Sequence, residues 1–294
     1  MNKPTPLPAE LTPYPVVANI TFAEGPSFDD LGNLYFVNYA YEGTIGRLTP
    51  GGTATIWVHT GGSAGGTKYD GDGHIVVADS GAGRITRFDV LTRKMEILTD
   101  EFEGQPYLRP NDLTLDRFGN IYFTVPAPSE PSKERLGAVY RINMSDDNSP
   151  TGVDRLLADV PVPNGLAVLR DPDRFYLALT GRNSIVAYDI ARDGSLVNEN
   201  TVIEFPDRSV DGIAFDEHQR LWVARWTHGS VAVVDVERRE QLADYPMGVE
   251  RVTNLAFWEN SLYVSIAGRS SVERLDVGCR GLAIVPDWSL RRRA

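Results

Sequence analysis

A short apolar segment occurs six times along the chain, and this repeat limits the folds that the chain can adopt. The spacings between successive copies are 41, 46, 54, 46 and 41 residues. Repeats of this length that contain several strands are typical of a β-propeller, in which each repeat forms one blade. The residues at the middle of the six copies are Tyr35, Val76, Tyr122, Tyr176, Trp222 and Tyr263.

A second β-branched segment follows each copy, and residues 83–89 and 229–235 are clear examples. A third, outer strand is expected after each pair, for example over residues 54–58, 95–98 and 155–158. Helical periodicity is nearly absent. A β-sandwich also contains many short strands, but it does not predict six copies of one two-strand signature. We therefore expect an all-β fold, namely a six-bladed β-propeller.

The whole chain, residues 1–294, is expected to form a single propeller domain. Residues 1–13 are expected to be an N-terminal extension, and residues 287–294 a C-terminal tail. A propeller closes when both ends of the chain join one sheet. Residues 15–20 are strand-like and could supply the outer strand of the last blade, and residues 278–285 are a competing candidate. The sequence leaves both open.

Four polar residues stand at nearly the same distance before the repeated segment. Glu24, Asn111 and Asp211 lie 11 residues before the middle residue of their copies, and Asn164 lies 12 before. Any one of them alone is typical of a turn, because Asn-Gly and Asp-Gly are common turn dipeptides. In a propeller, however, equal offsets place these residues around the central channel. The six ring positions are Glu24, Gly65, Asn111, Asn164, Asp211 and either Thr253 or Asn254.

Two carboxylates and two amide oxygens that meet in a channel are suitable ligands for a cation. Without a cation the carboxylates would repel each other, and their two negative charges balance one divalent ion. The set contains no His or Cys, and oxygen ligands favour a hard cation. We therefore expect one metal site in the central channel, with Ca²⁺ as the first choice and Mg²⁺, Mn²⁺ or Zn²⁺ as alternatives.

Charge and cysteine content exclude several classes of partner. The net charge is −11, and basic residues form a run only at Arg291, Arg292 and Arg293, so we expect no nucleic-acid partner. No apolar run is long enough to span a membrane, and the N-terminus does not resemble a signal peptide. A single cysteine, Cys279, precludes an internal disulfide and suits the cytoplasm. The oligomeric state stays open.

Other catalytic motifs are absent from the sequence. No Gly-x-Ser-x-Gly elbow occurs, and the glycine-rich residues 61–66 lack the Lys-Ser/Thr pair of a phosphate loop. The four histidines, His59, His74, His218 and His228, do not have the spacing of a zinc site. His228 follows a repeated segment closely, so it could face the ring and contact a substrate.

Several short motifs, in this order and at this spacing, resemble the regucalcin/gluconolactonase family, which is also called the senescence-marker-protein or luciferin-regenerating-enzyme family. The resemblance extends from Glu24 to about Leu282. The motifs that carry it are Ala23-Glu24-Gly25-Pro26, Arg109-Pro110-Asn111-Asp112, Pro163-Asn164-Gly165-Leu166, Asp211-Gly212-Ile213-Ala214, Leu221-Trp222-Val223-Ala224-Arg225-Trp226 and Gly278-Cys279-Arg280-Gly281-Leu282.

This resemblance implies a six-bladed propeller with one divalent metal in the channel. It implies that Glu24, Asn164 and Asp211 are direct ligands, and that Asn111 lies near the metal and can hold substrate. Arg109 matches a residue that contacts sugar-lactone oxygens. The reaction typical of the family is hydrolysis of an aldonolactone to the open acid, and related propellers cleave phosphotriesters. Asp211 would serve as the general base.

The chain departs from the family pattern after the third repeated segment. Lactonases of this group often carry Asp where this chain has Val125, and a second family acid has no clear counterpart, although Ser129 and Glu130 lie nearby. Fewer polar contacts to sugar hydroxyls leave room for a less polar substrate. Further substrate-contact candidates follow repeated segments: Tyr39, Tyr41, Thr180, Arg182, Trp226 and His228.

Three functions compete at this point. The leading hypothesis is a metal-dependent lactonase that acts on a small-molecule lactone. A second enzyme hypothesis keeps the metal but changes the substrate to a phosphotriester or an unusual metabolite. The third is a non-enzymatic propeller that binds calcium or serves as a scaffold, although a scaffold has no need of converging carboxylates.

Overall fold

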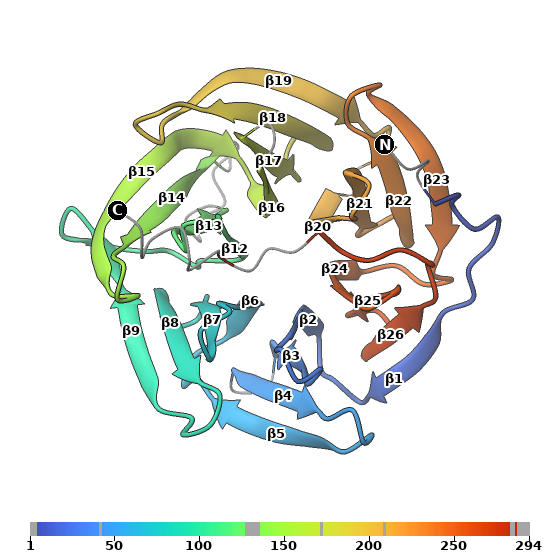
Figure 1. Cartoon of the computed structure of the whole chain (residues 1–294), viewed down its shortest axis with the longest axis horizontal. Coiled ribbons are helices and arrows are strands. Elements are labelled where there is room, and N and C mark those ends of the chain that lie inside the picture. The colour runs from blue at the N-terminus through green and yellow to red at the C-terminus, as the bar shows by residue number, and fades with distance from the viewer. Residues whose placement is uncertain are drawn as a thin grey trace.

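The structure is a computed structural model that describes residues 5–40, 43–126, 136–170, 173–207, 210–282 and 286. Every regular element within these ranges is a β-strand, and the ranges contain no helix that could cross a membrane. The strands form six four-stranded antiparallel sheets around a central channel, together with one two-stranded hairpin (Figure 1). The predicted six-bladed β-propeller is therefore confirmed.

Each blade begins with its innermost strand, beside the channel, and continues outward (Figure 1). Blade 1 consists of β2 (Ala23–Phe28), β3 (Leu34–Asn38), β4 (Thr44–Leu48) and β5 (Ala54–His59). Blade 2 consists of β6 (Ala64–Tyr69), β7 (His74–Asp79), β8 (Arg84–Asp89) and β9 (Met95–Thr99). Blade 3 consists of β12 (Leu113–Leu115), β13 (Ile121–Val125), β14 (Leu136–Met144) and β15 (Pro150–Pro161).

The second half of the chain repeats this arrangement. Blade 4 consists of β16 (Pro163–Arg170), β17 (Asp173–Leu179), β18 (Ser184–Ile190) and β19 (Leu196–Glu204). Blade 5 consists of β20 (Val210–Phe215), β21 (Arg220–Arg225), β22 (Ser230–Asp235) and β23 (Glu240–Pro246). Blade 6 consists of β24 (Val252–Trp258), β25 (Ser261–Ile266), β26 (Ser271–Leu275) and β1 (Tyr14–Ala18). A hairpin of β10 (Glu101–Phe102) and β11 (Gln105–Pro106) separates blades 2 and 3.

The N-terminal strand closes the ring. β1 pairs antiparallel with β26, so that Tyr14 lies opposite Arg274 and Ala18 opposite Ser271 (Figure 1). The competing segment lies elsewhere in its described part, because Gly281 forms a bridge with Asp216 of blade 5 and residues 283–285 lie outside the described residues. Of the two candidates that the sequence left open, the N-terminal one supplies the outer strand.

A buried aspartate explains why the repeated segments carry a large aromatic residue. In the turn after the innermost strand, an Asp carboxylate accepts backbone N–H groups and also the polar tip of that aromatic side chain. This satisfies a buried donor, as buried tyrosine and tryptophan require. The pairs are Tyr35 Oη to Asp29 at 3.0 Å, Tyr122 Oη to Asp116 at 3.3 Å and Trp222 Nε1 to Asp216 at 3.0 Å.

Apolar side chains pack between neighbouring blades. Tyr176 of blade 4 meets Phe215 of blade 5 edge to face, with ring centroids 4.9 Å apart. Trp222 of blade 5 likewise meets Phe257 of blade 6, with ring centroids 5.8 Å apart.

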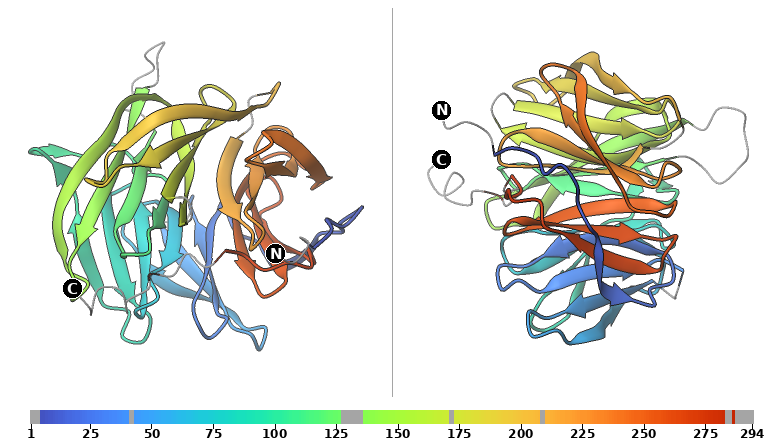
Figure 2. Two further views of the ribbon diagram at one scale, coloured as in Figure 1. Left: turned by 45° about the horizontal axis from the view of Figure 1, so that its top comes forward. Right: turned by 90° about the vertical axis from the view of Figure 1, so that its right-hand side faces the viewer.

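The strands of the propeller run between its two faces, so the central channel has one end at each face (Figure 2). We call the face where the innermost strands begin, such as at Ala23, the entry face, and the opposite one the turn face.

Candidate functional site

Four polar side chains meet at the entry-face end of the channel. Glu24 lies in β2, Asn164 in β16 and Asp211 in β20, whereas Asn111 lies two residues before β12. Asn111 Nδ2 donates a hydrogen bond to Asn164 Oδ1 at 2.8 Å. Asn164 also contacts Asp211, whose carboxyl group interacts electrostatically with Glu24. The structure therefore brings together the four residues that have nearly the same offset in the sequence, and we call them the ring.

Irregular strand pairing accompanies the ring residues. The register shifts between Glu24 and Ser27 in β2 and between Pro163 and Leu166 in β16. Equivalent shifts occur near the starts of β6, β20 and β24. Such bulges redirect side chains and are frequent beside active sites. Here the bulge interrupts the strict alternation of faces, so that ring side chains point into the channel.

Glycine at the ring position of blade 2 lets two blades approach closely. A Cβ atom on Gly65 would lie 2.4 Å from the carbonyl oxygen of Asn111, which is closer than real Cβ contacts. The backbone N–H of Gly66 donates to the same oxygen at 2.6 Å. Gly65 therefore gives the ring no side chain but allows the backbone contact that fixes Asn111.

A second polar layer adjoins the ring. Asp112 and Asn254 are 4% and 2% exposed, and Asn254 Nδ2 donates to Asp112 Oδ2 at 3.1 Å. Lys68 at the end of β6 is 9% exposed, and its charge acts on both Glu24 and Asp112. The sequence named Asn254 only as one of two alternatives, and it did not predict Asp112 or Lys68 as channel residues.

The other alternative, Thr253, serves the backbone. Its Oγ1 donates to the carbonyl oxygen of Ala23 at 2.8 Å and lies 2.7 Å from Ser265 Oγ. Thr253 thus joins blade 6 to blade 1 beside Glu24. At this ring position it is Asn254, and not Thr253, whose side chain bonds a channel residue.

The carboxyl groups of the channel favour the protonated state when no cation is near. Burial, together with the charge of Asp112, raises the pKa of Glu24 to about 8. Burial, then the charges of Glu24 and Asp112, raises the pKa of Asp211 well above its ordinary value. Burial also raises the pKa of Asp112, although Lys68 opposes this rise. When all three acids are ionised, Lys68 balances one of their negative charges. Two negative charges are then left for another cation to balance.

The donor chemistry of the ring fits a hard divalent cation. Within the described ranges, no three or more His, Cys, Asp and Glu side chains are grouped so that they could hold a metal. A cation at the ring would therefore need amide oxygens from Asn164 or Asn111 in addition to the carboxylates of Glu24 and Asp211. Asn164 Oδ1 would then bind the ion in place of the hydrogen bond that it accepts from Asn111 Nδ2. All-oxygen sets of this kind are typical of calcium sites.

Aromatic side chains lie at the entry face beside the ring. The ring centroid of Phe22 is 5.3 Å from that of Tyr39 and 5.7 Å from that of Trp226. Phe22 precedes Glu24 by two residues and adopts a positive φ of 63°. Tyr39 and Trp226 were expected on this face, but Phe22 was missed. Its place two residues before a ring residue was the only available signal.

Two other expected substrate contacts are already hydrogen-bonded. Thr180 Oγ1 donates to the carbonyl oxygen of Val210 at 2.7 Å and so joins blade 4 to blade 5. His228 has a side chain that is 47% exposed, and it stands between two carboxylates. Its Nδ1 lies 2.9 Å from Asp207 Oδ2 and its Nε2 lies 3.2 Å from Asp244 Oδ2.

Arg109 is exposed and has a positive φ of 61° in the segment between β11 and Asn111. Within the described part of the chain, its guanidinium group forms no hydrogen bond or ion pair.

Val125 is buried at the end of β13 and lines a cavity of about 320 Å³ with Leu108 and Tyr140. Arg182 is exposed and pairs with Glu199. Outside the described residues lie Tyr41, Ser129, Glu130 and residues 287–294.

Comparisons with known proteins agree with this fold. Gluconolactonase of Zymomonas mobilis is 28% identical over 246 residues, which cover 72% of this chain and 67% of that protein. Diisopropyl-fluorophosphatase of Loligo vulgaris is 27% identical over 271 residues, which cover 82% of this chain and 84% of that protein. The structure of a calcium-binding protein, regucalcin, from Agrobacterium tumefaciens superposes with a TM-score of 0.78 at 18% identity, covering 92% of this chain and 95% of that one.

A family model described as the SMP-30/Gluconolactonase/LRE-like region matches residues 22–268. This match contains all four ring residues, the whole of blades 1 to 5 and the two inner strands of blade 6, from the start of β2 to the end of β25. The chain therefore belongs to the SMP-30/gluconolactonase/LRE-like family.

Proposed function

We propose that this chain is a metal-dependent hydrolase that opens the ring of a small-molecule lactone, with Ca²⁺ as the first choice of cation. The observation that carries the proposal is the ring itself, in which Glu24, Asp211, Asn164 and Asn111 meet at one end of the channel. Similarity to a protein named gluconolactonase over 72% of the chain supports the reaction class.

Each ring residue has a role that its chemistry supports. Glu24, Asn164 and Asp211 would hold the cation, which, when bound, polarises a carbonyl group and makes a water molecule more acidic. Asp211 would accept the proton of the attacking water, because its carboxylate stands in the ring beside Asn164 and Glu24, where the cation would hold it ionised. Asn111 turns its amide toward the substrate, and Arg109 provides a fixed positive charge for a hydroxyl group or a developing oxyanion.

The surroundings of the ring favour a lactone with an apolar part. Phe22, Tyr39 and Trp226 present aromatic surface at the entry face. Val125 adds no polar group beside blade 3. Thr180 and His228 stay proposed substrate contacts, but each would have to share or exchange an existing hydrogen bond. A substrate with fewer hydroxyl groups than an aldonolactone fits these residues better.

Phosphotriester hydrolysis is the second candidate function. Similarity to a protein named diisopropyl-fluorophosphatase extends over 82% of the chain, which is a longer stretch than the match to the gluconolactonase. The same ring could orient a phosphoryl oxygen instead of a carbonyl oxygen.

We place the protein in the cytoplasm, because the one cysteine, Cys279, is free and buried.

A panel of lactones with a pH indicator tests the proposal. Aldonolactones, aliphatic γ-lactones and a phosphotriester are assayed with Ca²⁺ and with chelator, because ring opening releases a proton. We expect lactone turnover with Ca²⁺ and none with chelator. Asp211→Asn should abolish turnover, whereas Asp193→Asn, which changes an exposed turn residue, should retain it. Full activity of Asp211→Asn would remove the role of Asp211, and turnover of the phosphotriester alone would establish the second candidate.

A further inference from the structure

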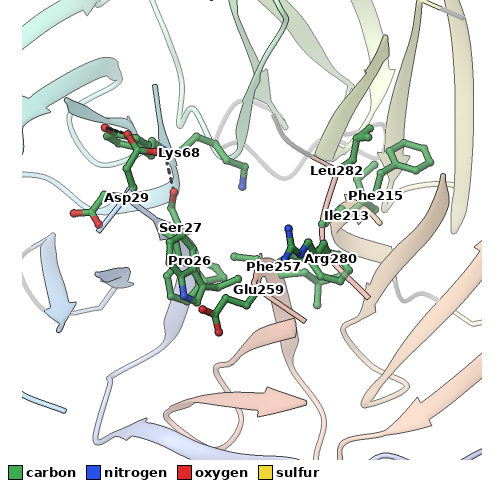
Figure 3. A pocket seen from close by; sticks show the side chains of 18 residues that line it. Pro26, Ser27, Asp29, Lys68, Ile213, Phe215, Phe257, Glu259, Arg280 and Leu282 are labelled. Atoms are coloured by element: carbon green, nitrogen blue, oxygen red, sulfur yellow. Dashed lines mark hydrogen bonds between the residues drawn. The ribbon is translucent and has the colours of Figure 1, made fainter. Parts of the chain in front are cut away.

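The turn-face end of the channel contains a cavity that the proposed hydrolysis does not use. Its volume is about 440 Å³, and it is formed by the ends of the inner strands of blades 1, 2, 5 and 6 (Figure 3). Residues 280–282 complete its wall. The ring residues do not line it. The cavity therefore lies at the opposite end of the channel from the ring.

Two cationic side chains are directed into this cavity (Figure 3). Lys68 is only 9% exposed, yet its ammonium group forms no hydrogen bond or ion pair with the described residues. It has only longer-range interactions with Glu24 and Asp112. A buried charge without a close partner is unfavourable, so an anion that pairs with it gains free energy.

Arg280 is the second cation, and its backbone is fixed. The Glu217 N–H donates to the Arg280 carbonyl oxygen at 2.8 Å, and the Arg280 N–H donates to Glu217 Oε1 at 2.9 Å. Leu282 N–H donates to Phe215 O at 2.8 Å. These bonds hold the segment on blade 5, whereas the guanidinium group has no hydrogen bond or ion pair within the described ranges. It is therefore available to a ligand.

The rest of the wall is apolar and partly aromatic. Phe28 stacks on Trp258 with ring centroids 5.2 Å apart and meets Tyr263 edge to face at 4.7 Å. Phe257 and Leu255 extend this surface along β24. Fixed aromatic planes of this kind favour a flat apolar ligand body.

The acidic residues of the cavity do not neutralise the two cations. The Asp29 carboxylate accepts hydrogen bonds from Leu31, Asn33 and Tyr35 within its own turn and strand. Asp30 and Glu259 are exposed, and Asp30 accepts a hydrogen bond from Tyr69 Oη. Lys68 and Arg280 are therefore the charged groups that a ligand inside the cavity can engage.

We propose that this cavity is a second ligand site, which binds a small organic carboxylate with a flat apolar body. The carboxylate pairs with Lys68 and Arg280, and the apolar body packs between Phe28, Trp258 and Phe257. The ring residues do not line this site, although the charge of Lys68 also acts on Glu24 and Asp112, and binding here does not depend on lactone hydrolysis.

Benzoate and its neutral isostere benzamide test the proposal, because they differ in charge but hardly in shape. Binding is measured by ligand-observed NMR titration on the full chain, treated with chelator so that benzoate cannot bind a metal at the ring. We expect benzoate to bind at least tenfold more tightly than benzamide. Lys68→Met and Arg280→Gln should each weaken benzoate binding at least tenfold, whereas Lys94→Met, which changes an exposed lysine, should not.

Three results would overturn the proposal. They are equal binding of benzamide and benzoate, unchanged benzoate binding by Arg280→Gln, and no binding of benzoate to the unmodified protein at millimolar concentration. Arg280 is exposed, so its substitution keeps the test valid even where Lys68→Met fails to fold. Asp211→Asn should bind benzoate as the unmodified protein does, which separates this site from the ring.

Discussion

Binding of Ca²⁺ to the ring should release protons and therefore depend steeply on pH. The pKa of Glu24 in the metal-free chain is raised to about 8, so at pH 6 only about one molecule in a hundred carries the ionised carboxylate that a cation requires. The apparent affinity for Ca²⁺ should then rise roughly tenfold per pH unit from pH 6 and level off above about pH 8. Asp211, whose pKa is also raised, makes the rise steeper.

Isothermal titration calorimetry measures both quantities. Titrations of chelator-treated protein at pH 6, 7, 8 and 9 give the affinity, and repeats in buffers of different ionisation enthalpy count the protons released. Glu24→Gln retains an oxygen ligand but has no proton to lose, so it should bind Ca²⁺ more weakly and with a shallower pH dependence. Glu101→Gln, which changes an exposed acid, should behave as the unmodified chain does. Equal affinity at pH 6 and pH 8, with no proton released, would refute the placement of the cation beside Glu24.

Three further predictions concern stability. Asp216→Ala breaks a buried ion pair with Arg220 and leaves Trp222 Nε1 without its acceptor, so the free energy of unfolding in urea should fall by roughly 3–5 kcal/mol; an unchanged midpoint would contradict the role of this turn. Gly65→Ala places a methyl group against the Asn111 carbonyl oxygen, so the free energy of unfolding in urea should fall by roughly 1–3 kcal/mol and Ca²⁺ binding should weaken. Gly52→Ala, at an open turn, is the control and should leave Ca²⁺ binding unchanged. Because folding raises the pKa of Glu24 from 4.5 to about 8, the chelator-treated protein should lose thermal stability as pH rises between those values, and added Ca²⁺ should restore it; a melting temperature independent of pH would argue against this shift.

The repeat was sufficient to predict the blades, because the same hairpin chemistry occurs in each. The aromatic residue at the middle of three of the repeated segments, such as Tyr35 and Trp222, bonds an aspartate six residues earlier, so the side chain that reveals the period also stabilises the turn. Nearly equal offsets likewise predicted which polar residues meet at the channel, because equivalent positions in the blades of a propeller face the same axis. Their roles as ligands stay proposals.

The second polar layer could not be predicted from the sequence, and the reason lies in the strand irregularities. Strict alternation would turn Asp112 away from the channel when Asn111 faces it. The backbone there departs from alternation: Thr124 O accepts the N–H of Asn111 while Thr124 N–H donates to Asp112 O, and both side chains bond channel residues. Lys68 was missed for another cause. It shares no offset with the ring, and its importance comes from burial, which the sequence does not reveal.

Closure of the ring by β1 has a consequence for the order of folding. β1 is the first strand of the propeller in chain order, and it must wait for its hydrogen-bonding partner β26, which is the last. Until then blade 6 exposes the unpaired edge of β26, and such edges invite pairing with other chains. Contacts of such long sequence separation also form slowly. A circular permutant that links the segment after β26 to the segment before β1 and opens the chain between blades 3 and 4 would remove this delay, since no blade would then combine the first strand with the last.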